Sequence, residues 1–184
     1  SLNNSFIGED SGKLNTTGSN NTAFGSNSLE NNTTGSTNTA IGFNALFFNT
    51  TGDNNVALGF TAGISNTTGD KNIAIGLQAM GGLDGSALPR NTTGFFNIAL
   101  GTSALSQNNT GQTNIGIGVD ALGSNTTGSD NTGLGAGALQ KNQTGSDNIA
   151  IGAEAGEFYY FNNGGSISQG NNTTPEKSIF IGSG

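Results

Sequence analysis

Side chains that could perform chemistry are sparse in this chain, and the most suggestive of them are pairs of carboxylates. Glu9 stands next to Asp10, and Glu154 precedes Glu157 by three residues. Two facing carboxylates would suffice for a glycosidase. However, the chain contains no His and no Cys, which excludes a Ser-His-Asp triad, imidazole and thiolate metal sites and a disulfide framework. Most of the acids also occupy variable positions typical of a solvated surface, so we predict that the protein is not an enzyme and uses no cofactor.

Asp130 and Asp147 form a further acidic pair, because they lie 17 residues apart at the same phase of a repeat. Carboxylate oxygens are preferred ligands of Ca²⁺, and a shared ion would explain the spacing. The alternative is a pair of solvated surface acids. The sequence favours this alternative, because the glycine-rich calcium-binding repeat is absent, and we predict no metal site.

Almost the whole sequence consists of that repeat. Its first residue is an Asn, which recurs every 17 residues except for one step of 25, and a last copy begins at Ser178, 30 residues after the preceding Asn. The nine Asn residues are Asn4, Asn21, Asn38, Asn55, Asn72, Asn97, Asn114, Asn131 and Asn148. A fixed period of this size predicts a solenoid, in which each copy forms one coil that stacks on the next.

The copy 38–54, NTAIGFNALFFNTTGDN, represents the others, and we number its positions from 1 at Asn38 to 17. Positions 1 to 5 form a short β-type run, in which positions 2 and 4 point to one face and position 3 to the other. Position 4 is large and apolar in every copy, Ile41 in this one, and we assign it to the core, facing the Leu or Met that is frequent at position 9. Position 3 is Ala or Gly in every complete copy except for Phe6. It either packs inside a narrow coil or lets a second chain approach.

Two glycines and two asparagines per copy define the predicted shape of the coil. Gly42 at position 5 and Gly52 at position 15 mark two corners, where a positive φ or a close approach of backbones requires Gly. Two corners separate two extended walls and give a flattened coil. Asn38 at position 1 and Asn49 at position 12 would stack into two columns of hydrogen-bonded amides. The Asn-Thr-Thr triplets at position 12 also match the N-glycosylation pattern, but their strict phase favours the structural role.

The composition narrows the surroundings in which such a rod would function. Apolar residues make up 32% of the chain and charged residues 9%, and the net charge is −7. The negative charge argues against nucleic acid and an anionic membrane as partners, and no segment is long enough to insert as a transmembrane helix. The absence of Cys suits an extracellular protein. The chain begins in register at Ser1 without a Met, and we expect it to be a segment of a longer protein.

Two insertions interrupt the period just after position 9, at residues 81–90 and 157–171. Insertions at one phase of a solenoid emerge on one face, which is often the binding face. The second insertion contains four consecutive aromatic residues, Phe158, Tyr159, Tyr160 and Phe161. They would bind a sugar ring or a protein partner, or they would cap the end of the rod or contact another subunit.

The middle copies carry large apolar residues at positions that are polar or small in most other copies. Position 6 is Phe43, Phe60 and Leu77 in three consecutive copies, and Phe47 and Phe48 lie nearby at positions 10 and 11. A contiguous exposed patch of this kind usually marks a contact surface. We predict that another subunit covers it; the alternative is that the first insertion does.

The segments NTAIGFNAL and NIAIGLQAM resemble the head repeats of YadA-like trimeric autotransporter adhesins, which carry an S-V-A-I-G motif. They resemble more closely the NTAIGxxAL-xxNTTG arrays of bacterial and phage fibre proteins. The resemblance spans nearly the whole chain. It implies a left-handed parallel β-roll, three of which pack about a common axis as a homotrimer that adheres to cells. The period of 17 is longer than that of a typical YadA-like head, and the aromatic insertion matches no motif of the family, so no binding site is transferred to it.

Residues 1–184 are therefore predicted to form one all-β domain, a parallel β-solenoid of about nine coils packed as a homotrimer. We expect it to be the adhesive domain of a bacterial or phage surface fibre, outside the cell or on the virion, which binds glycans or proteins on a host or prey cell. An ice-binding solenoid is one alternative, since Thr recurs at positions 13 and 14, although Asn109 and Gln143 interrupt it. A passive spacer in a fibre is the other.

Overall fold

The computed structural model describes residues 2–82, 92–156, 159–161, 167–169 and 179–181. In this part of the chain every regular element is a strand of three residues. Ten strands form one sheet: β1 (Ser5–Ile7), β2 (Thr22–Phe24), β3 (Thr39–Ile41), β4 (Val56–Leu58), β5 (Ile73–Ile75), β6 (Ile98–Leu100), β7 (Ile115–Ile117), β8 (Thr132–Leu134), β9 (Ile149–Ile151) and β12 (Ile179–Ile181). None of the described residues belongs to a helix that could cross a membrane.

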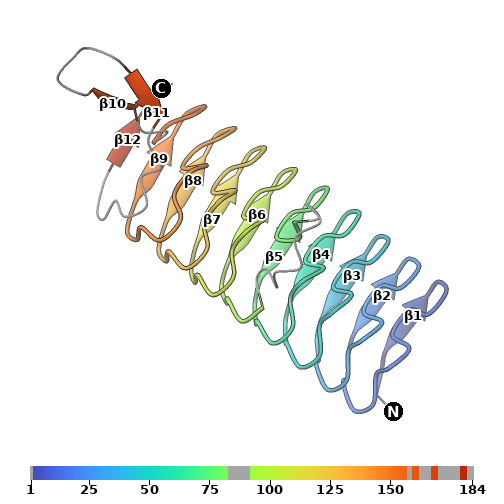
Figure 1. Cartoon of the computed structure of the whole chain (residues 1–184). Coiled ribbons are helices and arrows are strands. Elements are labelled where there is room, and N and C mark those ends of the chain that lie inside the picture. Colours follow the sequence, from blue (N-terminus) through green and yellow to red (C-terminus); the bar gives the residue numbers. More distant parts are fainter. Residues whose placement is uncertain (1, 83–91, 157–158, 162–166, 170–178, 182–184) are drawn as a thin grey trace.

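The sheet runs along the rod and confirms the predicted parallel β-solenoid (Figure 1). Each strand pairs in parallel with the strand of the next coil, so that Ala40 lies opposite Ala57 and Ile41 opposite Leu58. The register is kept across the first insertion, where Ile73 of β5 pairs with Ile98 of β6. Neighbouring strands are about 4.8 Å apart, so β1 to β9 span about 38 Å of the rod. We number the coils 1 to 9 by the strands β1 to β9.

Only one wall of each coil is a strand, which corrects the prediction of two extended walls. Positions 6 to 11 form consecutive turns, because position 7 and position 9 adopt left-handed backbone angles, φ 54° at Asn44 and φ 51° at Leu46. An extended run cannot pass through such residues. The turn wall is nevertheless joined from coil to coil: the N–H of Leu46 donates to the carbonyl of Ala62 at 3.0 Å, and that of Phe48 to Ile64 at 3.1 Å.

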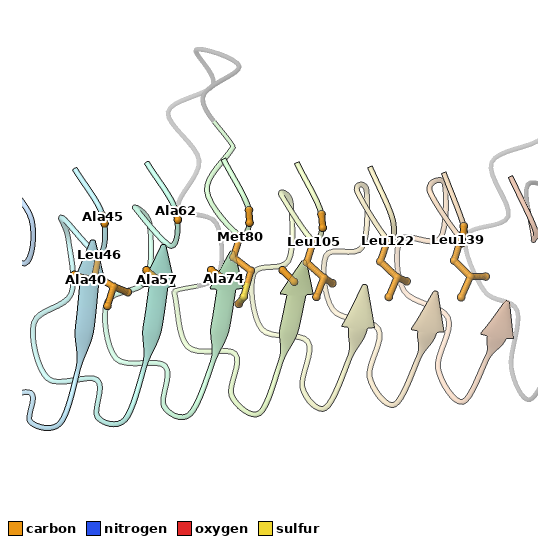
Figure 2. Packing of buried hydrophobic residues seen from close by; sticks show 14 of the residues in the cluster. Ala40, Ala45, Leu46, Ala57, Ala62, Ala74, Met80, Leu105, Leu122 and Leu139 are labelled. Carbon is orange, nitrogen blue, oxygen red and sulfur yellow. The ribbon is translucent and has the colours of Figure 1, made fainter. Parts of the chain in front are cut away.

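The core also lies on the opposite face of the strand from the one predicted. Position 4 points out of the coil, and Ile41 is 37% exposed, whereas Ala40 at position 3 is 0% and Leu46 at position 9 is 2% exposed. The Leu and Met side chains of position 9 form a row between the two walls (Figure 2). The prediction that positions 3 and 4 lie on opposite faces of the strand was therefore correct, but the assignment of position 4 to the core was wrong.

Lack of space explains why position 3 is Ala or Gly. A Cβ atom on Gly116 would lie 3.3 Å from Cγ of Leu105 in the preceding coil and 2.9 Å from the carbonyl oxygen of Ala121. Phe6 is the exception, and Gly12 at position 9 of its coil compensates for it, since a Cβ there would lie 2.4 Å from the Phe6 ring. Coil 1 has thus exchanged the small and the large residue, and the interior volume is kept.

Both predicted Asn columns are present, and they meet at a single carbonyl in every coil in which both Asn residues are described. Asn38 donates its backbone N–H to Oδ1 of Asn21 (2.9 Å) and its Nδ2 to the carbonyl of Gly52 (2.8 Å). Asn49 donates Nδ2 to Oδ1 of Asn32 (2.8 Å) and to the same Gly52 carbonyl (3.0 Å). Asn49 is 0% exposed, so a glycan cannot be attached there in the folded rod. The structural interpretation of the Asn-Thr-Thr triplets is confirmed.

The two corner glycines are needed for different reasons. Gly42 at position 5 has φ +134°, and a Cβ would also lie 2.3 Å from the carbonyl oxygen of Gly59 in the next coil. At Gly52, position 15, the cause is crowding: a Cβ would lie 2.4 Å from the Gly69 carbonyl oxygen and 2.5 Å from Oδ1 of Asn49. The second corner is therefore shaped by the Asn column that it supports.

Candidate functional site

The carboxylates do not converge on a site within the described residues, where no three His, Cys, Asp or Glu side chains come together. Asp10 pairs with Lys13, its Oδ2 lying 3.1 Å from Nζ, and this hydrogen bond and charge raise the pKa of the exposed lysine. Asp130 and Asp147 are both exposed, at φ 57° and 60°. Asp tolerates this left-handed conformation better than most residues, which accounts for the pair without a metal.

Two further acids have a structural role that the sequence analysis missed. Oδ1 of Asp53 accepts the backbone N–H of Ser36 at 2.7 Å, and Oδ1 of Asp70 accepts that of Asp53 at 2.7 Å. Ser residues take the same part in other coils, as when Ser36 Oγ accepts from the N–H of Ser19 (3.0 Å). Position 16 thus forms a third side-chain ladder. The recurrence of Ser and Asp at this phase was the available signal.

A surface feature that runs along the whole rod is the outer strand face, which we define as positions 2 and 4 of β1 to β9. None of its side chains is charged. Eight of its large apolar side chains are at least 36% exposed: Ile7, Phe24, Ile41, Val56, Leu58, Leu134, Ile149 and Ile151. Because the strands pair in register, equivalent positions lie side by side along the rod. Position 4 therefore forms a continuous apolar strip along the rod, flanked at position 2 by Val or Ile in five coils and by Ser or Thr in coils 1, 2, 3 and 8. An exposed strip of this kind is typical of contact surfaces.

Beside this strip lies the position-6 belt, which we define as Phe43, Phe60 and Leu77. They are 44%, 48% and 47% exposed, and the Phe43 and Phe60 rings stack with centroids 5.3 Å apart and an interplanar angle of 15°. Position 6 follows position 4 by two residues, so the belt is within about 7 Å of the strip. The predicted patch is thus exposed on the single chain; its contact with another subunit stays a prediction.

The other aromatic residues that the sequence singled out form separate pairs. Phe47 and Phe48 lie on the turn wall and contact each other edge to face, with centroids 4.6 Å apart. Phe48 is 50% exposed and Phe47 is partly buried. A further contact, which sequence reasoning missed, places Nζ of Lys71 4.7 Å from the centroid of the exposed Phe96 ring.

The aromatic insertion contains a β-hairpin. β10 (Tyr159–Phe161) pairs antiparallel with β11 (Ile167–Gln169), with Tyr159 opposite Gln169 and Tyr160 opposite Ser168. The hairpin forms a sheet of its own near the C-terminal end of the rod (Figure 1). Phe158 and most of the first insertion lie outside the described residues. Ligand binding by Tyr159 and Tyr160 stays a prediction.

The two Thr columns have different environments. The hydroxyl of Thr33, at position 13, donates to the carbonyl of Thr50 at 2.9 Å, and that of Thr50 to Thr67 at 3.0 Å. Thr34 and Thr51, at position 14, are exposed. Position 13 therefore joins the coils to one another, and a surface built from two solvent-facing Thr columns is absent from these coils.

Searches of protein-family models, of curated proteins and of solved structures find no significant match to this chain. The assignment as a parallel β-solenoid of 17-residue coils with Asn ladders rests on its strand pairing and hydrogen bonds. Any function has to be argued from its surfaces.

Proposed function

We propose that this solenoid is the adhesive domain of a homotrimeric surface fibre of a bacterium or phage, which binds glycans or proteins on a host or prey cell. The outer strand face carries this proposal. It contains an apolar strip about 38 Å long, and this strip is exposed in the single chain even though it carries no charge. Covering it from water would stabilise an assembly.

A second copy of the chain suits this strip best. The net charge of −7 lies elsewhere on the chain, so the strip offers no ionic contact to a basic or acidic partner and no repulsion to another copy. A partner that packs along the strip must also match side chains that recur about every 4.8 Å. Another copy has that spacing. The resemblance to YadA-like heads supports three copies and a left-handed coil.

Adhesion is supported by the surface that would remain outside such an assembly. Thr recurs at positions 13 and 14 beside one corner of the coil, and the position-14 residues, such as Thr34 and Thr51, are exposed along the rod. Polar side chains held at fixed spacing on a rigid scaffold suit the hydroxyl groups of a glycan. The hairpin β10–β11 adds Tyr159 and Tyr160, whose rings combine an apolar surface with a hydroxyl. The absence of Cys agrees with an extracellular location.

The first test is the solution mass by light scattering, followed by binding of the labelled domain to candidate host or prey cells. We expect three times the chain mass of 18.4 kDa and saturable binding. Replacing Tyr159 and Tyr160 by Ala should abolish binding and leave the trimer intact, whereas Phe96→Ala is the matched control away from the hairpin. A monomer at all concentrations would contradict the trimer. Unchanged binding by the double Tyr variant would exclude the hairpin as the binding site, and a natural domain that binds none of the cells would favour a passive spacer.

Ice binding is the less favoured function. A flat ice-binding surface would need regular rows of solvent-facing hydroxyls, and the position-13 hydroxyls of Thr33 and Thr50 are engaged with the next coil. A thermal hysteresis measurement decides the matter, and a clear depression of the freezing point relative to the melting point would reverse this ranking.

A further inference from the structure

Lateral packing of two rods of this kind has a register problem. The outer strand face presents Ile41, Leu58 and Ile75 at the same position of successive strands. If one rod slides along another by a single coil, each of these side chains meets a neighbour of nearly the same size. Such exchanges cost little. A register has to be fixed by residues that do not repeat.

The position-6 belt is such a feature, because it occupies only coils 3 to 5. In the coils on either side, position 6 is Ser26 and Thr102. Phe43, Phe60 and Leu77 are all close to half-exposed in the single chain, and the two rings already stack on each other. The belt therefore forms one apolar block of three coils beside a row of position-4 side chains that is apolar in every coil.

We propose that the position-6 belt fixes the register of a parallel assembly, in which copies of this chain pack side by side with their belts at the same height. This inference rests on the self-association proposed above and specifies it. When the belts coincide, each Phe and Leu packs against apolar side chains of the same block. A slip by one coil leaves Phe43 of one rod beside Ser26 of the other, and Leu77 beside Thr102.

The copies run in the same direction because the assembly proposed above is a trimer about a common axis.

Spin labels can measure this register directly, because the natural chain has no Cys. A single Cys is introduced in turn at Thr17, Thr51 or Thr127, which are exposed at position 14 of coils 1, 3 and 7. Distances between labels on different subunits are then measured. Parallel packing predicts the same distance for all three variants, within about one strand spacing of 5 Å. Zero offset further predicts that this distance is shorter than the one between Thr51-labelled chains and chains labelled at Thr34 or Thr68, which are exposed at position 14 of the neighbouring coils. Distances that differ strongly between coil 1 and coil 7 would overturn the proposal.

A belt variant, with Phe43→Ser, Phe60→Ser and Leu77→Ser, tests what sets the register. We expect its distance distribution to broaden into several slipped registers, and its dissociation constant to rise by at least about tenfold. The matched control is Leu14→Ser with Phe96→Ser, which removes two large apolar side chains of similar exposure, 48% and 49%, away from the belt and from the predicted contact patch. The control should keep a single narrow distance. Equal thermal unfolding of the monomeric forms shows that both variants fold.

The outcomes separate this inference from the proposed function. A natural chain that stays monomeric overturns both. A trimer whose label distances vary along the rod overturns the register alone, as does a belt variant that keeps one narrow distance and the natural affinity.

Discussion

The two faces of each short strand reverse the usual expectation that the larger apolar residues of a strand face the core. The inner face holds Ala or Gly at position 3, as Ala40, which is 0% exposed. The outer face holds large apolar residues, such as Leu58, which is 43% exposed. Residue size at these two positions therefore follows the space available, which is narrow inside the coil and open outside it. A large apolar residue in a thin solenoid can indicate an interface between chains as well as a core.

Truncating one Leu on each side of the wall gives the largest expected contrast. Leu105 is 0% exposed and Leu134 is 42% exposed. Leu105→Ala should lower the free energy of unfolding by about 2–5 kcal/mol, because it leaves a cavity in the core row. Leu134→Ala should change the free energy of unfolding of the monomer by about 0.5 kcal/mol or less. Urea denaturation of the monomeric forms measures both, and equal losses would contradict the assigned faces.

A charge on the outer strand face separates folding from association. Leu58→Lys places an ammonium group in the middle of the apolar strip, where it can reach water only if no second chain covers it. We expect the monomer to fold normally and the dissociation constant of the assembly to rise by at least about a hundredfold. Light scattering and circular dichroism together measure the two effects. A trimer that tolerates this lysine would show that the strip is not the contact.

Enlarging the inner face should strain the coil. Ala99 lies at position 3 and is 0% exposed, and at the equivalent Gly116 a Cβ would already contact Leu105 and a carbonyl oxygen. Ala99→Leu should therefore destabilise the fold by about 1–3 kcal/mol through overpacking. Ile98→Leu, one residue earlier on the outer face, is the control. The comparison is made by thermal unfolding, and a silent Ala99→Leu would show that the interior is wider than described.

The smallest contrast concerns neighbouring threonines. Thr50 donates its hydroxyl to the Thr67 carbonyl at 3.0 Å, whereas Thr51 is exposed. Thr50→Val should cost about 0.5–1.5 kcal/mol of stability, the net value of one hydrogen bond. Thr51→Val should stay within about 0.5 kcal/mol of the natural chain. Denaturant midpoints resolve the two, and a larger loss for Thr51→Val would reverse their roles.

Much of the fold could be predicted because the repeat leaves the same signal many times. The recurrence of Asn38 and Asn49 every 17 residues predicted the two ladders, and Gly42 and Gly52 predicted the corners, all of which are confirmed. Which face of the strand is buried could not be predicted. Large residues at positions 2 and 4 around a small one at position 3 fit either orientation. The interior beside position 3 is filled by a backbone carbonyl of the same coil and a Leu of the preceding coil, at Gly116 the carbonyl of Ala121 and the side chain of Leu105, and only these contacts decide the orientation.

The turn wall was missed because its backbone contradicts the usual preferences of its residues. Leu46 adopts φ 51°, a left-handed conformation that residues other than Gly, Asn and Asp seldom adopt. The hydrogen bonds to the next coil hold it there, and such contacts have no local signal in the sequence. The belt was visible as a run of Phe43, Phe60 and Leu77 at one phase, whereas the ladder of Ser36, Asp53 and Asp70 became clear only from the bonded atoms.

The Asn columns give the rod a mechanical consequence. In both columns the later coil donates to the earlier one, as Asn49 does to Asn32 and Asn38 to Asn21, whereas backbone bonds such as Thr39 N–H to the Asn55 carbonyl run the other way. Each coil is therefore joined to its neighbours by the same set of bonds. A chain pulled from its C-terminal end would unfold one coil at a time. Each release of 17 residues lengthens the chain by about 50–55 Å. A fibre built from such coils would extend under force in equal small steps rather than unfold in a single event.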